Sequence, residues 1–401
     1  MRLVVVAPNV SENMSGEAIK VMMYLNHLAT TDIPVELITH ARSRDHLDPL
    51  SQKIKVHVID DDIFQVLAWK SVLFRPTVHM QFFAHVRSFV KRMMKDDPDT
   101  YFQYMVPVSP LQIRLPVKNS RSALGPVTGN IFYPPVMHET EPRRYKYARL
   151  LRQTLHVAAS IWPEKKQFAR ILNSGGDRTR QSLLSGGAHG DQIADVWDSA
   201  VSSKIIERPA IPIEGECFRF LCNGRFDPHK GIDLAIRALA QADDRITLDV
   251  YGKGGMETAW RALVDELGLH DRVTFKGWLD SHDDLIDAMA GYRGFVFPSL
   301  AEANGIVIQE ALALGLPIIC VNHGGPSVLT TDQSAIRLEP APAETLVPQI
   351  ANAMNRLATN PELAKRLAGA GVRDARERFA WSSVTRQWLT AMQADDLVSR
   401  L

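Results

Sequence analysis

The chain has 401 residues, which exceeds one domain of typical size and favours two domains of about 200 residues each. Its 45% hydrophobic and 23% charged residues are typical of globular proteins, and its apolar runs are too short for a membrane span, so we expect a cytoplasmic protein. The net charge of +1 conceals an asymmetry: residues 1–210 hold 27 Lys+Arg and 20 Asp+Glu, and the remainder hold 19 and 25. This asymmetry indicates that one half of the protein meets an anionic surface.

Short apolar runs alternate with helical patterns at the start of the chain. Three of these runs are predicted to be buried strands: residues 2–7, 35–39 and 54–59. The apolar spacing over residues 19–28 predicts a helix between the first two strands, and this order predicts a doubly wound parallel sheet. Such sheets bind ligands beyond the carboxyl ends of their strands, so the loop 8–17 with Gly16 is a candidate ligand loop.

Two basic helices are predicted further along, over residues 82–95 and 143–152. Each fits a surface helix with a solvated basic face, and the alternative is contact with an anionic membrane surface. Residues 99–109 are predicted to form a strand that ends in a proline-rich loop, and residues 122–130 a strand that runs into a glycine-rich turn, while residues 169–173 are predicted to be a further element of the same domain. The second of these ends in a turn formed by Thr128, Gly129 and Asn130, which is a second candidate ligand loop.

The two prolines in residues 207–212 predict a linker between domains. A second series of alternating elements follows it, with strands predicted at residues 218–223, 248–251, 273–277, 294–297 and 317–321. A last helix is predicted over residues 382–397. The expected domains are therefore residues 1–208 and 209–380, followed by a terminal helix in residues 381–401.

The loop and helix after the strand 294–297 carry two acidic residues. Asn304 is the predicted helix cap and Gly305 lies in the first turn, which places Glu302 in the loop and Glu310 inside the helix. The start of such a helix offers free N–H groups to an anion, and Gly305 lets a phosphate approach the backbone. Glu310 could accept hydrogen bonds from vicinal hydroxyls. The alternative is that both carboxylates are solvated charges.

The loop after the strand 218–223 carries Arg225 and Lys230, which could reach one diphosphate from two sides. Two cations and a helix end would neutralise a leaving diphosphate without a metal ion. Neither a convincing Asp-x-Asp motif nor a spaced set of cysteines is present, so no metal site is expected. The glycine-rich segment 252–255 is interpreted as a structural turn.

Glu302 and Glu310, followed by Ala-Leu-Ala-Leu-Gly-Leu-Pro, resemble the signature of the retaining nucleotide-sugar glycosyltransferases of family 4, which have the GT-B fold. Further matching segments occur in the family's order at residues 223–233, 249–255, 272–277 and 324–326. The resemblance covers about residues 218–330. It implies an α/β protein of two Rossmann-like domains facing each other across a cleft, with the donor held by the second domain and the terminal helix packed on the first.

The resemblance also implies a function: retaining, metal-independent transfer of a hexose from a UDP- or GDP-linked sugar to a hydroxyl of a glycan or lipid-linked acceptor, without a cofactor. The implied catalytic residues are Arg225, Lys230 and Glu302. The implied donor-binding residues are Gly224, Gly252, Asn304, Gly305, Ile306 and Glu310. The loops with Gly16, Thr128, Gly129 and Asn130 would meet the acceptor or line the cleft. The chain would work in the cytoplasm or on the inner face of the membrane, with no nucleic-acid partner.

Two departures from the family pattern concern the cleft. Asn304 replaces the family's usual aromatic residue, and a histidine that many members carry near residues 122–130 is absent, His138 being the next one along the chain. Two alternatives remain open: a sugar-nucleotide epimerase or phosphorylase with the same fold, and a non-catalytic sugar-nucleotide-binding protein. A nicotinamide dehydrogenase is disfavoured because the loop 8–17 lacks the glycine fingerprint of such enzymes.

Overall fold

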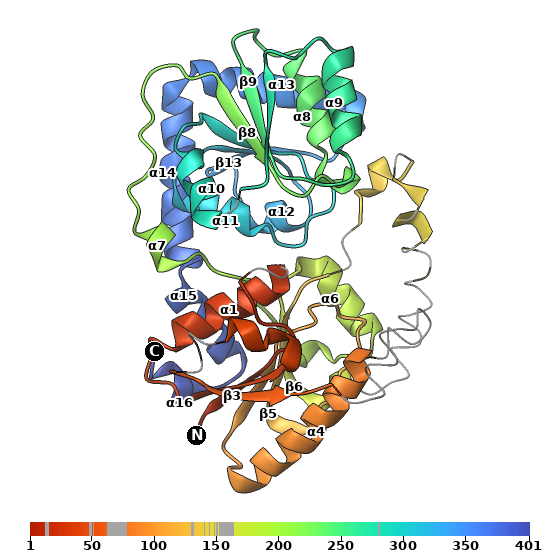
Figure 1. Ribbon diagram of the computed structural model, residues 1–401, viewed down its shortest axis with the longest axis vertical. Coiled ribbons are helices and arrows are strands. Elements are labelled where there is room, and N and C mark those ends of the chain that lie inside the picture. The colour runs from red at the N-terminus through yellow and green to blue at the C-terminus, as the bar shows by residue number, and fades with distance from the viewer. Residues whose placement is uncertain are drawn as a thin grey trace. The chain divides into compact units, whose positions relative to one another are not determined.

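The chain forms two compact units in the computed structural model (Figure 1). The first comprises residues 1–130, 151–199 and 381–401, and the second comprises residues 131–150 and 200–380. The described residues are 1–12, 16–47, 50, 52–61, 78–129, 132–139, 141–143, 145–147, 149, 151, 164–279 and 281–401.

The first unit is built on a parallel sheet with the strand order β3-β2-β1-β4-β5-β6-β7. Its strands are β1 (Leu3–Val6), β2 (Val35–His40), β3 (Lys55–Ile59), β4 (Tyr101–Tyr104), β5 (Asn119–Val127), β6 (Phe168–Asn173) and β7 (Ile193–Asp195). The predicted doubly wound parallel sheet is confirmed. The strand predicted to end in a proline-rich loop within residues 99–109 corresponds to β4, which ends at Tyr104 before Pro107 and Pro110.

Helices of the first unit cover this sheet (Figure 1). They are α1 (Gly16–Leu28), α4 (Val78–Asp96), α6 (Gly176–Ser185), α15 (Trp381–Ala391) and α16 (Asp395–Val398). Helix α4 buries Phe82, Phe83 and Val86 in the core and leaves Lys91 and Arg92 exposed, as expected for a surface helix. Its contact with a membrane stays a prediction. The second predicted basic helix, over residues 143–152, lies partly outside the described residues.

The C-terminal helix is interrupted, where one continuous helix was predicted. Helix α15 ends at Ala391, Gln393 has a positive φ of 57°, and the N–H of Ala394 returns to the carbonyl of Leu389 at 2.9 Å. A left-handed residue followed by such a bond ends an α-helix. Helix α15 packs on α1 of the same unit, where the Tyr24 ring lies 4.8 Å from the ring of Trp388.

The second unit has a parallel sheet with the strand order β10-β9-β8-β11-β12-β13. Its strands are β8 (Arg219–Asn223), β9 (Thr247–Tyr251), β10 (Val273–Gly277), β11 (Gly294–Phe297), β12 (Ile318–Val321) and β13 (Ala335–Leu338). Each of the five strands predicted from residue 218 onward is confirmed. Strand β13 was not predicted from the sequence, and neither was β7 of the first sheet.

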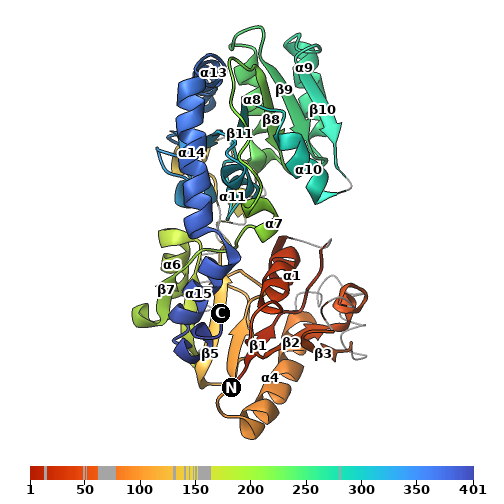
Figure 2. The ribbon, with the colours of Figure 1, turned by 90° about the vertical axis from the view of Figure 1, so that its left-hand side faces the viewer.

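The helices of the second unit follow one another from α7 to α14 along the chain. They are α7 (Ser203–Ile206), α8 (Ile232–Leu239), α9 (Glu257–Glu266), α10 (His282–Met289), α11 (Ile306–Ala313), α12 (Gly325–Leu329), α13 (Ala343–Thr359) and α14 (Pro361–Arg378). Helices α8, α9 and α13 share one core cluster with β8 and β9, and α14 lies beside α11 (Figure 2). Within the described part of the chain, none of the helices combines the length and apolarity needed to cross a bilayer.

The division of the chain corrects the expected domain boundaries. Residues 131–150 and 200–208, which were assigned to the first domain, belong to the second unit. Tyr133 and Met137 are each 4% exposed and join the core of the second unit, and the Tyr145 hydroxyl lies 3.0 Å from Nδ1 of His229. The burial of Tyr133 and Met137 depends on residues far away in the sequence, so the local sequence pattern does not predict it.

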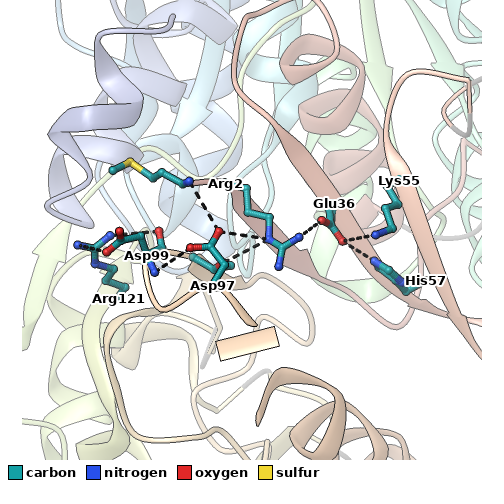
Figure 3. Close-up of polar contacts among 9 residues, drawn as sticks. Arg2, Glu36, Lys55, His57, Asp97, Asp99 and Arg121 are labelled. Atoms are coloured by element: carbon teal, nitrogen blue, oxygen red, sulfur yellow. Dashed lines mark hydrogen bonds and ion pairs between the residues drawn. The ribbon is translucent and has the colours of Figure 1, made fainter. Parts of the chain in front are cut away.

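A polar cluster lies at the amino ends of β1, β2 and β3 in the first unit (Figure 3). The buried carboxylate of Glu36 accepts hydrogen bonds from Arg2 and from Nε2 of His57, the latter at 2.5 Å, and lies 3.7 Å from Nζ of Lys55. Burial favours the neutral acid, but the His57 hydrogen bond and the charges of Arg2 and Lys55 outweigh it and lower the pKa of Glu36.

Glu36→Gln should therefore change how stability depends on pH. Because the folded-state pKa of Glu36 is lowered, its stabilisation is complete above the ordinary carboxyl pKa and is lost as the pH falls through the lowered value. We expect Glu36→Gln to lower the unfolding temperature at neutral pH and to flatten its acid dependence. Thermal unfolding across this pH range measures both effects. Asp60→Asn, which alters an exposed pair with Arg44, is the matched control, and equal acid dependence of both variants would contradict the assignment.

Candidate functional site

The predicted donor residues of the second unit gather where its strand order reverses. Strand β8 is followed in the chain by β9 on one side, whereas β11 lies on its other side, and ligands of doubly wound sheets bind beyond such a point. The loops after β8 and β11 touch there. The N–H of Leu300 donates to the carbonyl of His229 at 2.8 Å, and the Ser299 hydroxyl donates to the same carbonyl at 3.2 Å.

Two of the three predicted catalytic residues form an ion pair across these loops. Lys230 ends the short 3₁₀ turn Pro228–Lys230, and its Nζ lies 2.5 Å from Oε2 of Glu302. The two side chains are 15% and 16% exposed, and Nζ also lies 5.6 Å from the centre of the Phe297 ring. The pair is therefore sheltered but reachable from solvent, and it places a cation and a carboxylate together at the carboxyl ends of β8 and β11.

Arg225, the third predicted catalytic residue, lies differently. Its side chain is 71% exposed, and Nη2 lies 3.4 Å from Oδ2 of Asp227. Arg225 and Lys230 share one loop, but each contacts its own carboxylate. An exposed arginine can change its rotamer at little cost, so its reach toward a ligand stays a prediction.

Gly252 allows the loops after β8 and β9 to meet. Its φ is +136°, and a Cβ at this position would lie 1.9 Å from the carbonyl oxygen of Gly224. The N–H of Phe226 donates to the carbonyl of Lys253 at 2.9 Å, which continues the contact. The interpretation of residues 252–255 as a structural turn therefore holds, and the predicted contacts of Gly224 and Gly252 with a donor remain untested.

The start of α11 differs from the prediction. The cap is Gly305, with φ +90° and without a side-chain cap bond, and the helix begins at Ile306. The prediction of Asn304 as the cap is wrong because the chain turns into the helix through a left-handed residue, which favours glycine. The backbone of Asn304 instead packs against α12: a Cβ on Gly325 would lie 2.1 Å from the Asn304 carbonyl oxygen. The N–H of Gly325 donates to the carbonyl of Glu302 at 2.8 Å.

Glu310 is buried inside α11, with 1% of its surface exposed. Its Oε1 lies 2.8 Å from Nε2 of His282, and its Oε2 is buried without a hydrogen-bond partner among the described residues. The alternative that Glu310 is a solvated charge is therefore wrong. A buried carboxylate oxygen without a donor costs free energy, so this atom is a candidate acceptor for a ligand hydroxyl.

Two histidines beside this site were missed by the sequence analysis. His282 begins α10, and its hydrogen bond to Glu310 raises its pKa. Burial lowers the pKa of His229, and the charge of neighbouring Lys230 acts in the same direction. Both effects favour the neutral form of His229. The sequence places His282 directly after Ser281 and beyond the carboxyl end of β10. This position does not reveal that Glu310 is its partner.

Comparison with known proteins finds relatives of the larger part of the second unit. Residues 203–373, which include Arg225, Lys230, Glu302, His282 and Glu310, match the family described as glycosyl transferases group 1. This region resembles that family and is called the group 1 domain. A curated relative, the lipopolysaccharide core biosynthesis glycosyltransferase LpsD of Rhizobium meliloti (strain 1021), is 32% identical over 190 residues. The match covers 45% of this chain and spans about half of the relative, at 53%.

Solved structures resemble the whole chain, not the group 1 domain alone. The lipopolysaccharide outer core galactosyltransferase WaaB matches with a TM-score of 0.66 at 15% identity, covering 98% of this chain and 100% of that one. The Anabaena protein Alr3699/HepE in complex with UDP matches with a TM-score of 0.65 at 15% identity, with the same coverage. The chain therefore has the GT-B fold, as the resemblance implied.

The other predicted loop residues lie outside the group 1 domain, in the first unit. Gly16 is the first residue of α1 and not part of a loop, which corrects the predicted loop 8–17. Thr128 follows β5 and is 3% exposed, and the carbonyl of Gly129 accepts a hydrogen bond from the Thr179 hydroxyl at 3.0 Å. Asn130 lies outside the described residues. Their contact with an acceptor stays a prediction.

His138, which follows these loops in the chain, belongs to the second unit. Its Nε2 lies 3.1 Å from the carbonyl of Tyr133, a local contact within the same segment. This contact fits a histidine that stabilises its own turn.

Proposed function

We propose that the protein is a retaining glycosyltransferase that moves a hexose from a nucleoside-diphosphate sugar to a hydroxyl of a glycan or lipid-linked acceptor. The observation that carries this proposal is the pairing of Lys230 with Glu302 in the loops before α11, together with the buried Glu310 inside α11, in a region that matches the group 1 family. A cation, a helix start and two acids match a ligand that joins a diphosphate to hydroxylated sugars.

Lys230 and Arg225 would bind the diphosphate as its charge grows in the transition state, which lowers the barrier. Nζ of Lys230 donates to Oε2 of Glu302 at 2.5 Å. When the donor binds, its phosphate oxygens would replace Glu302 as the partner of Lys230. Glu302 could then accept hydrogen bonds from the donor sugar. Glu310 would hold the ribose through the buried Oε2. The bond from C1 of the sugar to the phosphate oxygen breaks, the bond from C1 to the acceptor oxygen forms on the same face, and a phosphate oxygen takes the acceptor proton.

The donor would be UDP- or GDP-linked, and UDP is the first probe because HepE is described in complex with UDP. LpsD is named for lipopolysaccharide core biosynthesis, which supports a polysaccharide or lipid-linked acceptor made at the inner face of the membrane. Since two cations and a helix start would neutralise the diphosphate, we expect turnover to be unchanged by a chelator.

Glu310→Gln tests the proposal. The glutamine amide has nearly the size of the carboxylate. Toward a ribose hydroxyl it presents either an NH₂ group, which cannot accept a hydrogen bond, or an amide oxygen, which is a weaker acceptor than a carboxylate. We expect UDP or GDP to bind about tenfold more weakly, and transfer from the sugar nucleotide to fall at least as far. Calorimetry with each diphosphate and a donor-consumption assay with acceptor extracts measure the two effects. Glu362→Gln, at an exposed position on α14, is the control.

The outcomes separate the alternatives. Binding of a diphosphate by the wild type without turnover of any donor would favour a non-catalytic binding protein. Consumption of a sugar nucleotide without formation of a glycoside would favour an epimerase or phosphorylase. Inversion at C1 in the product would contradict the retaining assignment.

A further inference from the structure

His282 and Glu310 come from different elements of the group 1 domain. Glu310 lies in the middle of α11, whose residues from Ile308 to Ala313 are buried, and it is 1% exposed. His282 is the first residue of α10, and its side chain is 55% exposed. The imidazole therefore connects a buried carboxylate to solvent at the carboxyl edge of the sheet.

The two oxygens of Glu310 are in different situations. An ionised carboxylate only accepts hydrogen bonds, so Nε2 of His282 carries the proton and donates to Oε1 at 2.8 Å. Oε2 is buried and lacks a donor among the described residues. Oε1 is thus bonded to His282, and Oε2 is the open oxygen, because it has no hydrogen-bond partner among the described residues.

The position of His282 is itself fixed. The Ser281 hydroxyl caps α10 by accepting from the N–H of Asp283 at 3.1 Å. Two ion pairs, Lys204 with Asp283 and Arg208 with Asp287, join α10 to the segment around α7. A shift of α10 would break these contacts, so the imidazole is held at one end by its helix and at the other by Glu310.

We propose that His282 is a positioning residue that orients and partly neutralises Glu310, so that the open Oε2 selects donor nucleotides with ribose hydroxyls over deoxy analogues. This inference rests on the proposed function, because it assigns the ribose to Glu310. A ligand lacking these hydroxyls would leave Oε2 buried and unpaired, which is a strong basis for discrimination. Without His282, the carboxylate could rotate and lose this preference.

The charge of His282 adds a dependence on pH. The groups that face it are Glu310 on α11 and Asp283 on α10, and Lys204 and Arg208 on the side of α7 oppose Asp283. The Glu310 hydrogen bond raises the pKa of His282, and above that pKa the imidazole no longer carries a positive charge. Binding of an anionic diphosphate should weaken as the pH rises through the pKa of His282.

The experiment compares UDP with 2′,3′-dideoxy-UDP by calorimetry on the full chain, or the guanosine pair if GDP binds more tightly. We expect the wild type to prefer the ribonucleotide by about tenfold or more and His282→Ala to reduce this preference to less than about threefold. The donor KM should rise in His282→Ala with a smaller change in kcat. His282→Gln, which can still donate to Oε1 but cannot titrate, should keep the preference and lose the His282-dependent change with pH.

His270→Ala is the matched control. His270 is also a half-exposed histidine beside a carboxylate, with Nδ1 at 3.3 Å from Oδ1 of Asp265. The His270→Ala variant should retain both the preference for the ribonucleotide and the pH profile of the wild type. An unchanged ribose preference in a folded His282→Ala variant would overturn the inference and leave the proposed function standing. A wild type that binds neither UDP nor GDP would overturn both.

Discussion

Lys230→Ala should weaken the binding of the nucleoside diphosphate by about 1.5–3 kcal/mol, which is about 10- to 150-fold in Kd. The reason is the loss of a sheltered cation in the loop after β8, where Lys230 is 15% exposed and pairs with Glu302. The variant also leaves Glu302 without its cation, which adds a repulsive charge beside the phosphates. Calorimetric titration with UDP and GDP measures the loss.

The Lys230 variant can be separated from a general loss of the site. Uridine or guanosine without phosphates should bind the wild type and Lys230→Ala equally, because the lost contact is to phosphate. Lys365→Ala removes an exposed lysine that pairs with Glu362 on α14 and should leave all affinities unchanged. If the wild type binds a diphosphate and Lys230→Ala binds it as tightly, Lys230 is not the phosphate ligand.

Among the variants described, Arg114→Ala should lower the free energy of unfolding most, by about 3–5 kcal/mol. This loss lowers the unfolding temperature of a domain of this size by on the order of 10 °C. Arg114 is 0% exposed, donates to the carbonyls of Pro107, Ser109 and Gln112, and has Nη1 at 3.5 Å from Oε1 of Glu164. Its removal leaves three carbonyl groups and the buried carboxylate of Glu164 without this donor. Differential scanning calorimetry of the full chain measures the shift.

Two further variants define what Arg114 contributes. Arg114→Lys keeps the charge but cannot reach several carbonyls at once, so it should recover only part of the stability. Arg44→Ala removes an arginine that is 61% exposed and pairs with Asp60, and it should shift the unfolding temperature by little. Equal shifts for Arg44→Ala and Arg114→Ala would contradict the role assigned to the buried arginine.

Local sequence pattern predicted the elements of both sheets well, because buried parallel strands are short apolar runs. Residues 294–297 and 317–321 became β11 and β12, and the loop between them carries Glu302 as expected. Strands β7 and β13 were not predicted, and the other errors in the elements concern their ends. Asn304 was preferred as the cap of α11, but the chain needs the left-handed Gly305 there, and the last helix is interrupted at Gln393 for a related reason.

The candidate site could be predicted only as a set of residue types on loops that share one edge of a sheet. Lys230 and Glu302 were both named, but their pairing across 72 positions of sequence was not. His282 was missed because its partner Glu310 lies 28 positions away on another helix. Nor does any local pattern reveal that Tyr145 contacts His229, 84 positions later.

The sequence by itself determined the alternation of strands and helices, the two acidic positions of the loop and helix after β11, and the cationic loop after β8, because hydrophobic period and residue spacing act over one element at a time. The tertiary structure alone decided which charges pair, which oxygen of Glu310 stays open and which unit receives residues 131–150. Burial and pairing depend on atoms brought together from distant parts of the chain, and only the folded backbone brings them together.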